Sequence, residues 1–219
     1  MSSIRFRSFA CFILRGTRMK IRDGSMTASH ARRDVPSWVY VAITLAILAG
    51  AAVILLAMGR TPWCRCGSIK VWTSDAWGPE NSQQFTDPYT FTHITHGVLL
   101  YCLLQLVARR QPLGVRFLLA VAAESAWEVF ENTDMVINRY RAATMALGYY
   151  GDSVLNSIGD IVACMVGFMI ASRLSARVTA VMVVVLELML TLLIRDSLLL
   201  NIVMLIYPIE AVKIWQAGG

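Results

Sequence analysis

Five runs of mostly apolar residues in this chain are each long enough to cross a bilayer, which a transmembrane helix spans in about 20 residues. The first run, 38–58, contains no charged residue, and the others are 90–108, 113–130, 154–172 and 176–194. The chain is 57% apolar and only 16% charged, a composition too apolar for an ordinary soluble domain. These runs predict an all-α protein, a polytopic transmembrane helix bundle with five spans.

A shorter apolar run near the C-terminus predicts a sixth span. Residues 198–207 are too few to cross a bilayer alone. The run becomes long enough if it continues through Pro208 to residue 215, although it then carries Glu210 and Lys213. We therefore predict a short sixth span here.

Residues 38–215 are predicted to form one transmembrane domain, with an outer loop at 59–89 between the first two spans. Residues 1–37 would form a basic arm, and its only apolar stretch, 9–14, is too short for a secretory signal. A start at Met26 would give a cleaner protein. We interpret the preceding segment either as a disordered arm or as an over-extended start.

The positions of Lys and Arg predict the orientation, because short cytoplasmic loops carry an excess of these residues. Residues 1–37 contain eight of them. Arg109 and Arg110 follow the second span, and Arg173 and Arg177 follow the fourth. Strict alternation places these segments on one side, which would be the cytoplasm. The net charge of +6 is thus a signal of topology, and it gives no reason to expect a nucleic-acid partner.

Ionisable residues gather near the non-cytoplasmic face of the membrane when the spans are threaded in order. A charge at the centre of a bilayer costs at least about 2.5–3.5 kcal/mol, so such residues mark functional sites by default. The residues at this depth are His93, His96, Glu124, Glu128, Glu131, Asp152 and Asp160.

The two histidines follow a helix start signal, in which Asp87 is the N-cap and Pro88 the first helical residue. A nearby helix N-terminus disfavours the imidazolium ion, which leaves neutral rings at His93 and His96 able to bind a metal or accept a proton. The alternative is that both histidines only hydrogen-bond to neighbouring spans.

Carboxylates in the third and fourth spans would complete the site. Glu124, Glu128 and Glu131 are spaced i, i+4, i+7 and share one helical stripe. Stacked carboxylates repel unless they share protons, face water or hold a cation. In the fourth span, Asp160 lies deep, whereas Asp152 is either a site residue or only an N-cap. We predict Glu124, Glu128 and Asp160 as catalytic residues.

Three further residues are candidates for binding a substrate. Asn156 shares a helix side with Asp160. Arg141 and Arg195 lie in outer segments, and a guanidinium group matches the geometry of phosphate and carboxylate groups. The alternative for the arginines is ordinary loop charge.

Cys64 and Cys66 lie in the outer loop. Three interpretations are open: a disulfide, a redox pair, or two soft metal ligands. Combined with His93 and His96 they would supply a zinc set of two Cys and two His, but the spacing is not a standard one. We rank them below the histidines as metal ligands.

Several strings are similar to a known bacterial family, among them PWCRCGSIKVW, DPYTFTHITHG, ESAWEVFENT, RYRAAT, YYGDSVLNSIGD and IRDSLLLN. The chain resembles uncharacterised protein family 0314, also called domain of unknown function 2585, over residues 38–217. This resemblance implies a multi-pass protein of the bacterial inner membrane, and it implies no particular activity.

A weaker likeness is to VanZ-type membrane proteins, which share the order His, Glu, Arg and D-x-x-x-N-x-x-G. Here that pattern would use Asp152, Asn156 and Gly159. The second histidine, the extra glutamates and the C-x-C loop depart from it. The likeness covers the second to fourth spans and implies an association with the cell envelope.

Three functions fit these features. The first is a metal-dependent enzyme with a divalent ion such as zinc, acting on a lipid or lipid-linked substrate. The second is a non-catalytic accessory protein of the envelope, whose polar cluster only joins helices. The third is a proton- or cation-coupled transporter with a carboxylate relay. We rank them in this order; the sequence makes no prediction about oligomeric state.

Overall fold

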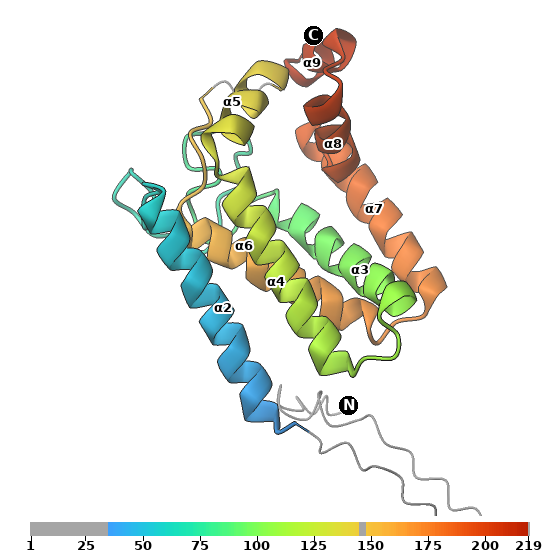
Figure 1. Ribbon diagram of the computed structural model, residues 1–219. Helices are drawn as coiled ribbons and strands as arrows, with labels where there is room; N and C mark the ends of the chain where they lie inside the picture. The colour runs from blue at the N-terminus through green and yellow to red at the C-terminus, as the bar shows by residue number, and fades with distance from the viewer. Residues whose placement is uncertain (1–34, 145–147, 219) are drawn as a thin grey trace, which may run out of the picture.

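The computed structural model describes residues 35–144 and 148–218, so most of the basic arm lies outside the described residues. The described part is all-α, as predicted, apart from one isolated β-bridge between Trp72 and Thr86. Its helices (Figure 1) are α2 (Ser37–Ala57), α3 (Thr90–Val107), α4 (Leu113–Glu131), α5 (Asp134–Ala143), α6 (Val154–Ala171), α7 (Ala176–Ile194), α8 (Leu198–Ile206) and α9 (Glu210–Gln216).

Four of these helices are long and apolar enough to cross a membrane: α2, α3, α6 and α7. They match four of the five predicted spans. The remaining one, α4, is a 19-residue helix at the predicted place. It carries Arg116, Glu124 and Glu128, so its composition alone does not qualify it as a span.

The predicted short sixth span is not confirmed. Residues 198–216 form two short helices, α8 and α9, of nine and seven residues. Pro208 lies in the break between them, where its missing N–H and its ring disfavour a continuous helix. A nine-residue helix is only about 14 Å long, roughly half the thickness of a bilayer core.

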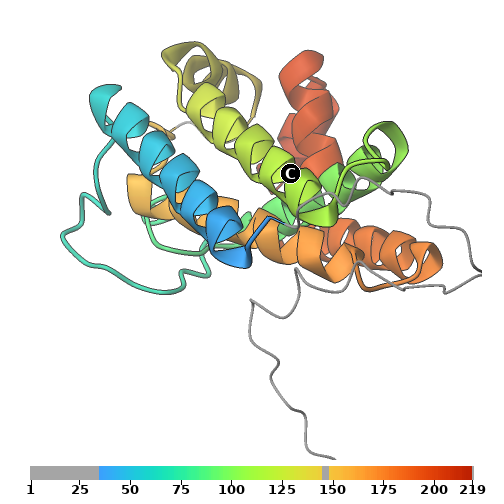
Figure 2. The same ribbon diagram turned by 60° about the horizontal axis from the view of Figure 1, so that its bottom comes forward.

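The helix packing centres on α6, which contacts α2, α3 and α4 (Figures 1 and 2). The closest approach is between α3 and α6, where a methyl group at Gly97 would overlap the backbone carbonyl oxygen of Cys164. A methyl group at Gly167 would likewise overlap the carbonyl oxygen of Ile94. Small residues allow helix backbones to approach in this way.

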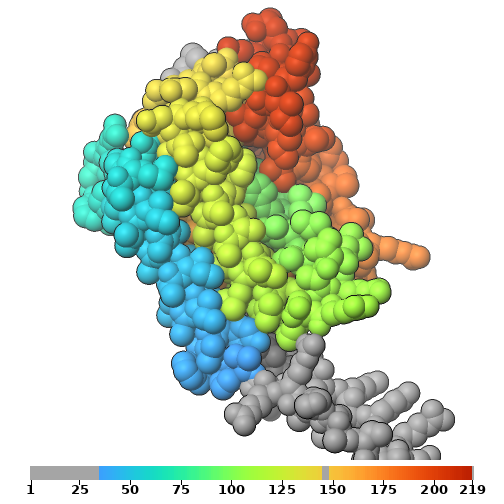
Figure 3. All heavy atoms as spheres, in the orientation of Figure 1, coloured from blue at the N-terminus to red at the C-terminus, as the bar shows by residue number. Residues whose placement is uncertain are grey.

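The apolar core lies beside this contact, between α2, α4 and α6. Its buried members are Ala51, Phe117, Ala120, Val121, Ile161 and Phe168. On the face shown in Figure 3, α2 and α4 lie side by side, with α8 and α9 at the upper edge. The apolar core and the polar residues of the candidate site therefore occupy different halves of the bundle.

The loop 59–89 folds over the start of α6. Val154 and Leu155 donate their backbone N–H groups to the carbonyl oxygens of Thr61 and Pro62, at 2.8 and 3.1 Å. The first N–H groups of a helix have no partner within the helix, so the loop satisfies them. Ser153 caps the same helix by accepting from the N–H of Asn156.

Of the two acids considered as N-caps, Asp152 is not one, whereas Asp87 caps the turn that leads into α3. The helix α6 is capped by Ser153, and Asp152 bonds elsewhere. The helix α3 begins at Thr90 with Tyr89 as its N-cap. Asp87 instead forms the turn before it, with its carboxylate accepting from the N–H groups of Tyr89 and Ser82 at 2.8 Å each.

Candidate functional site

Side chains from three helices meet at the end of the bundle to which α5, α8 and α9 also belong (Figure 1). Glu124 of α4 lies between the two histidines of α3. Its Oε1 is 2.7 Å from Nδ1 of His93 and 2.9 Å from Nδ1 of His96. From α6, Oδ2 of Asp160 approaches Nε2 of His93 at 3.8 Å. The sequence thus correctly selected residues that the fold brings together.

Glu128 lies one turn further along α4 and is fully buried, with 0% of its surface exposed. Its Oε1 is 3.3 Å from Nδ1 of His93, yet neither oxygen makes a hydrogen bond to the described residues. A buried carboxylate in this state is costly unless a cation or a proton compensates its charge. Of the residues in this cluster, Glu128 therefore most needs a cation or a proton to compensate its charge.

Two overlapping groups in the cluster could hold a metal ion, and both contain His93. One is His93 with His96 and Glu124, and the other is His93 with Glu128 and Asp160. In each group the ligand atoms lie within 4.8 Å of one another. Ligands about 2.0–2.1 Å from a tetrahedral zinc are roughly 3.3 Å apart. The hydrogen bonds around Glu124 would thus have to widen by about half an ångström to admit zinc.

A cavity of about 580 Å³ opens beside this cluster. His93, His96 and Asp160 line it, whereas Glu124 and Glu128 do not. The opposite wall comes from loop 59–89, from the segment before α6, and from α5, α8 and α9. This volume lies in the range of sites that hold a small molecule.

Asp152 stands on another part of the cavity wall. Its Oδ2 accepts from the amide of Asn132 at 2.8 Å and its Oδ1 from the hydroxyl of Tyr149 at 3.0 Å. Burial, together with the charge of Glu131, raises the pKa of Asp152 to about 7. Asp152 is thus neither an N-cap nor part of the metal-binding groups.

The three residues predicted to bind a substrate lie outside the residues that line the cavity. Asn156 is buried and donates to the carbonyl oxygen of Gln84 at 2.9 Å, which holds loop 59–89 to α6. Arg141 donates to the carbonyl oxygen of Tyr149, and Arg195 to that of Trp215. Both arginines are exposed and make these bonds to nearby backbone.

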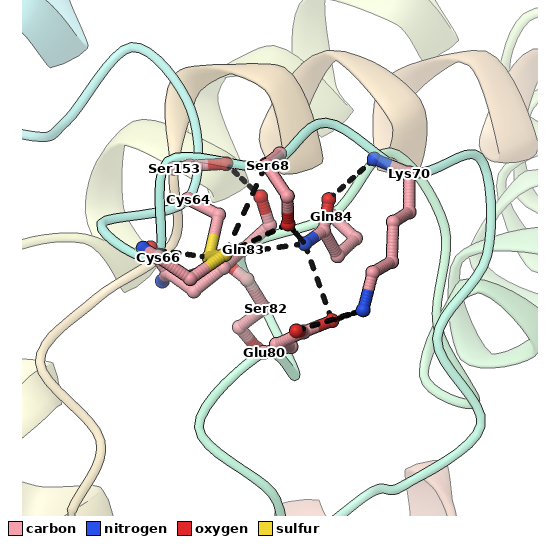
Figure 4. The surroundings of a disulfide bond; sticks show 9 residues. All are labelled: Cys64, Cys66, Ser68, Lys70, Glu80, Ser82, Gln83, Gln84 and Ser153. Atoms are coloured by element: carbon pink, nitrogen blue, oxygen red, sulfur yellow. Dashed lines mark hydrogen bonds and ion pairs between the residues drawn. A yellow bond between two sulfur atoms is a disulfide. The ribbon is translucent and has the colours of Figure 1, made fainter.

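Cys64 and Cys66 form a disulfide, the first of the three interpretations. The hydroxyl of Ser68 lies 3.0 Å from the sulfur of Cys66, and the Gln84 amide lies 3.6 Å from it (Figure 4). Nearby, Lys70 pairs with Glu80 at 2.6 Å and lowers the pKa of that exposed carboxyl group (Figure 4). Paired in this way, the two sulfurs offer no thiolate to a metal ion.

Sequence reasoning missed Asp196, which follows α7 and also lines the cavity. It accepts hydrogen bonds from the Tyr89 hydroxyl at 3.0 Å and the Asn201 amide at 3.1 Å. Burial raises its pKa to about 6. The only available signal was an acid directly after an apolar run, which is ordinary for a helix end.

These features define a class of protein: a helical bundle with apolar, membrane-compatible helices and a buried histidine–carboxylate site at one end. Within this class, the chain belongs to the family described as protein of unknown function DUF2585, whose model matches residues 55–218. This confirms the resemblance to family 0314.

Relatives cover nearly the whole chain. A UPF0314 protein of Paracoccus denitrificans is 47% identical over 187 residues, which are 85% of this chain and 95% of the relative. Another, of Rhizobium meliloti, is 48% identical over 200 residues, 91% of this chain and 100% of the relative. One from Sphingopyxis alaskensis is 44% identical over 83% of this chain and 95% of its own length. No solved structure matches the chain.

Proposed function

We propose that this protein is a metal-dependent enzyme of the bacterial inner membrane, acting on a lipid or lipid-linked substrate from the periplasmic side. The carrying observation is the fully buried Glu128, whose two oxygens lack hydrogen bonds beside His93. A divalent cation held by His93, His96 and the carboxylates of Glu124 and Glu128 would neutralise both acids, and it requires Glu128, which now groups with His93 and Asp160, to move toward His96 and Glu124. Histidine with carboxylate ligands suits zinc.

Asp160 is the proposed general base. It lines the cavity, and its Oδ2 lies 3.8 Å from Nε2 of His93, so it stands beside a proposed metal ligand at the space for a substrate. A divalent metal ion lowers the pKa of a bound water and polarises the group that the water attacks. A carboxylate on the cavity side can accept the proton of that water.

The proposed orientation follows from the helix ends. The turns that contain Arg109, Arg110 and Arg173 lie at the end of the bundle opposite to the cavity (Figure 1). The positive-inside rule places that end in the cytoplasm. The cavity and loop 59–89 then face the periplasm, where a disulfide such as Cys64–Cys66 is stable. In this arrangement α4 crosses the bilayer as a fifth span, with its acids covered by α3 and α6.

Elemental analysis of protein purified in mild detergent without chelator tests the metal. We expect about one equivalent of zinc or another divalent metal in the wild type. The His93→Ala/His96→Ala variant and Glu128→Gln should lose it, and the control Asp134→Asn, an exposed acid on α5, should keep it. Equal metal contents in the wild type and the double variant would overturn the assignment of the ligands.

The enzymatic part needs a separate test. The metal-loaded protein is incubated with a total bacterial lipid extract, and the products are followed by mass spectrometry. We expect a product that disappears with Asp160→Asn while the metal content is retained. A product that is formed equally by the metal-free double variant would contradict the proposal.

A further inference from the structure

Apart from the two histidines, the ionisable groups on the cavity wall that carry charge are acids. Among the described residues that line the cavity there is no Lys or Arg. The acids that line it are Asp87, Glu131, Asp152, Asp160 and Asp196. Such a wall repels phosphate and carboxylate groups and attracts cations.

The arginines that reach this region from outside are already engaged. Arg60 donates to the carbonyl oxygen of Tyr150 at 2.7 Å and pairs with Asp134 at 3.5 Å. The guanidinium carbon of Arg65 lies 4.1 Å from the centre of the Tyr150 ring. Arg65 shows that an aromatic ring at the rim of the cavity accepts an organic cation.

Aromatic side chains supply much of the remaining wall. Trp77, Trp127 and four tyrosines line the cavity. The rings of Tyr140 and Tyr149 stand edge to face with centroids 5.5 Å apart. The negative faces of such rings attract ammonium groups, and the contact strengthens when water is excluded. An inorganic ion would gain little from this lining, whereas an alkylated ammonium group gains both charge and apolar contact.

Two buried amides on the wall have polar atoms without partners, which gives an independent sign of a polar ligand. Gln83 is 1% exposed and Gln216 is 5% exposed, and both line the cavity. Oε1 of Gln83 makes no hydrogen bond, and neither do Oε1 and Nε2 of Gln216. Buried polar atoms are satisfied in most native structures, so the two Oε1 atoms are suited to accept from the N–H or O–H groups of a bound molecule, and Nε2 of Gln216 can donate to its oxygen.

We propose that the cavity binds an organic cation, an ammonium group carried either by a small amine or by a lipid head group. This inference names the substrate class of the enzyme proposed above and rests on that proposal for its catalytic meaning. Binding itself depends on the acids, the aromatic rings and the two glutamines, and not on a metal.

Isothermal titration of the protein in nanodiscs of phosphatidylglycerol tests this proposal with choline as the probe. The matched control is 3,3-dimethyl-1-butanol, which has the shape of choline without its charge, and glycerol phosphate is the anionic control. We expect choline to bind at least about tenfold more tightly than the neutral alcohol. Equal binding of choline and the alcohol, or preferential binding of glycerol phosphate, would overturn the proposal.

Charge-neutralising variants locate the binding site. Glu131→Gln and Asp196→Asn should each weaken choline binding by at least about fivefold, and the exposed Asp134→Asn should not. Two variants protect the test against a folding defect, since Glu131 lies on α4 and Asp196 follows α7. Unchanged affinity in both folded variants would contradict the assignment of the cavity.

The lipid composition of the nanodiscs distinguishes the two sources of the ammonium group. If a head group occupies the cavity, adding phosphatidylethanolamine to the nanodiscs raises the apparent Kd for choline; if a soluble amine does, the Kd stays constant. Repeating the titration after chelator treatment separates the two proposals. Choline binding by protein that never held metal would retain this inference and remove the metallo-enzyme, whereas metal without choline binding would do the reverse.

Discussion

Asn132 and Asp152 are joined by two hydrogen bonds that tie the end of α4 to the segment before α6. The Asn132 amide donates to Oδ2 of Asp152 at 2.8 Å, and the Asp152 N–H donates to Oδ1 of Asn132 at 2.7 Å. Asn132 is 0% exposed. The pair therefore fixes the spacing between the helix that carries Glu124 and Glu128 and the helix that carries Asp160.

Replacing Asn132 with Ala should destabilise the protein by about 1–3 kcal/mol, because it leaves a buried carboxylate and a buried N–H without these partners. Unfolding in mild detergent, followed by tryptophan fluorescence, measures the loss. Asn138→Ala, on the exposed side of α5, is the control and should change little. A loss of the same size in both variants would show that the pair is not special.

The α3–α6 contact should not tolerate a larger residue at Gly97. Gly97→Ala is expected to cost about 1–3 kcal/mol, the usual range for overpacking, since its methyl group meets the backbone of Cys164 and Phe168. Gly50→Ala in α2 has open space around it and should be neutral or slightly stabilising. Thermal unfolding of the two variants gives the comparison, and a neutral Gly97→Ala would argue against this packing.

Chelation should destabilise the wild type and spare Glu128→Gln. A metal that binds only the folded state stabilises it by about 2.7 kcal/mol when present at about 100 times its Kd. Removing the metal with EDTA thus lowers the unfolding temperature of the wild type. The variant has no metal to lose and keeps its unfolding temperature. A fall of equal size in both proteins would point to an effect of EDTA elsewhere.

Asp196 should give the stability a pH dependence of a defined sign. Burial raises its pKa from 3.8 to about 6 in the folded state, so folding takes up a proton between these values. Stability from this group is present below about pH 4 and is lost as the pH rises to about 6, at most about 3 kcal/mol.

The variant Asp196→Asn removes this loss. Its free energy of unfolding relative to the wild type should therefore rise between about pH 4 and 6 and then level off. The altered bonds to Tyr89, Ser197 and Asn201 add a cost that does not change with pH. Denaturation at several pH values measures the slope. Glu187 of α7 also faces this group, so Glu187→Gln in the same series reports its share. A parallel pH profile for the wild type and Asp196→Asn would contradict the shift.

The disulfide provides a test of orientation. In intact cells, a membrane-impermeant maleimide should label the protein more strongly after treatment with a membrane-impermeant reductant, because Cys64 and Cys66 become free thiols on the periplasmic side. The Cys64→Ser/Cys66→Ser variant should show no such gain. A gain that appears only after the membrane is permeabilised would place loop 59–89 in the cytoplasm and reverse the proposed topology.

The sequence by itself determined the helices and the polar cluster. Hydrophobic length and period are local properties, so α2, α3, α6 and α7 could be located from the chain alone. His93, His96, Glu124, Glu128 and Asp160 could be selected because an ionisable residue inside an apolar helix is costly wherever the helix lies. The break between α8 and α9 at Pro208 is equally local, because proline disfavours a continuous helix wherever it lies.

Only the tertiary structure decided what surrounds that cluster. The cavity wall comes from segments far apart in the chain, so no local pattern showed that Asp196 belongs to it or that Arg141 and Arg195 turn to nearby backbone carbonyl groups instead. Asp152 and Asn156 had the right residue types for a site, but their partners are Asn132 and Gln84. A side chain's role depends on the groups within hydrogen-bonding distance, and long-range packing alone sets those groups.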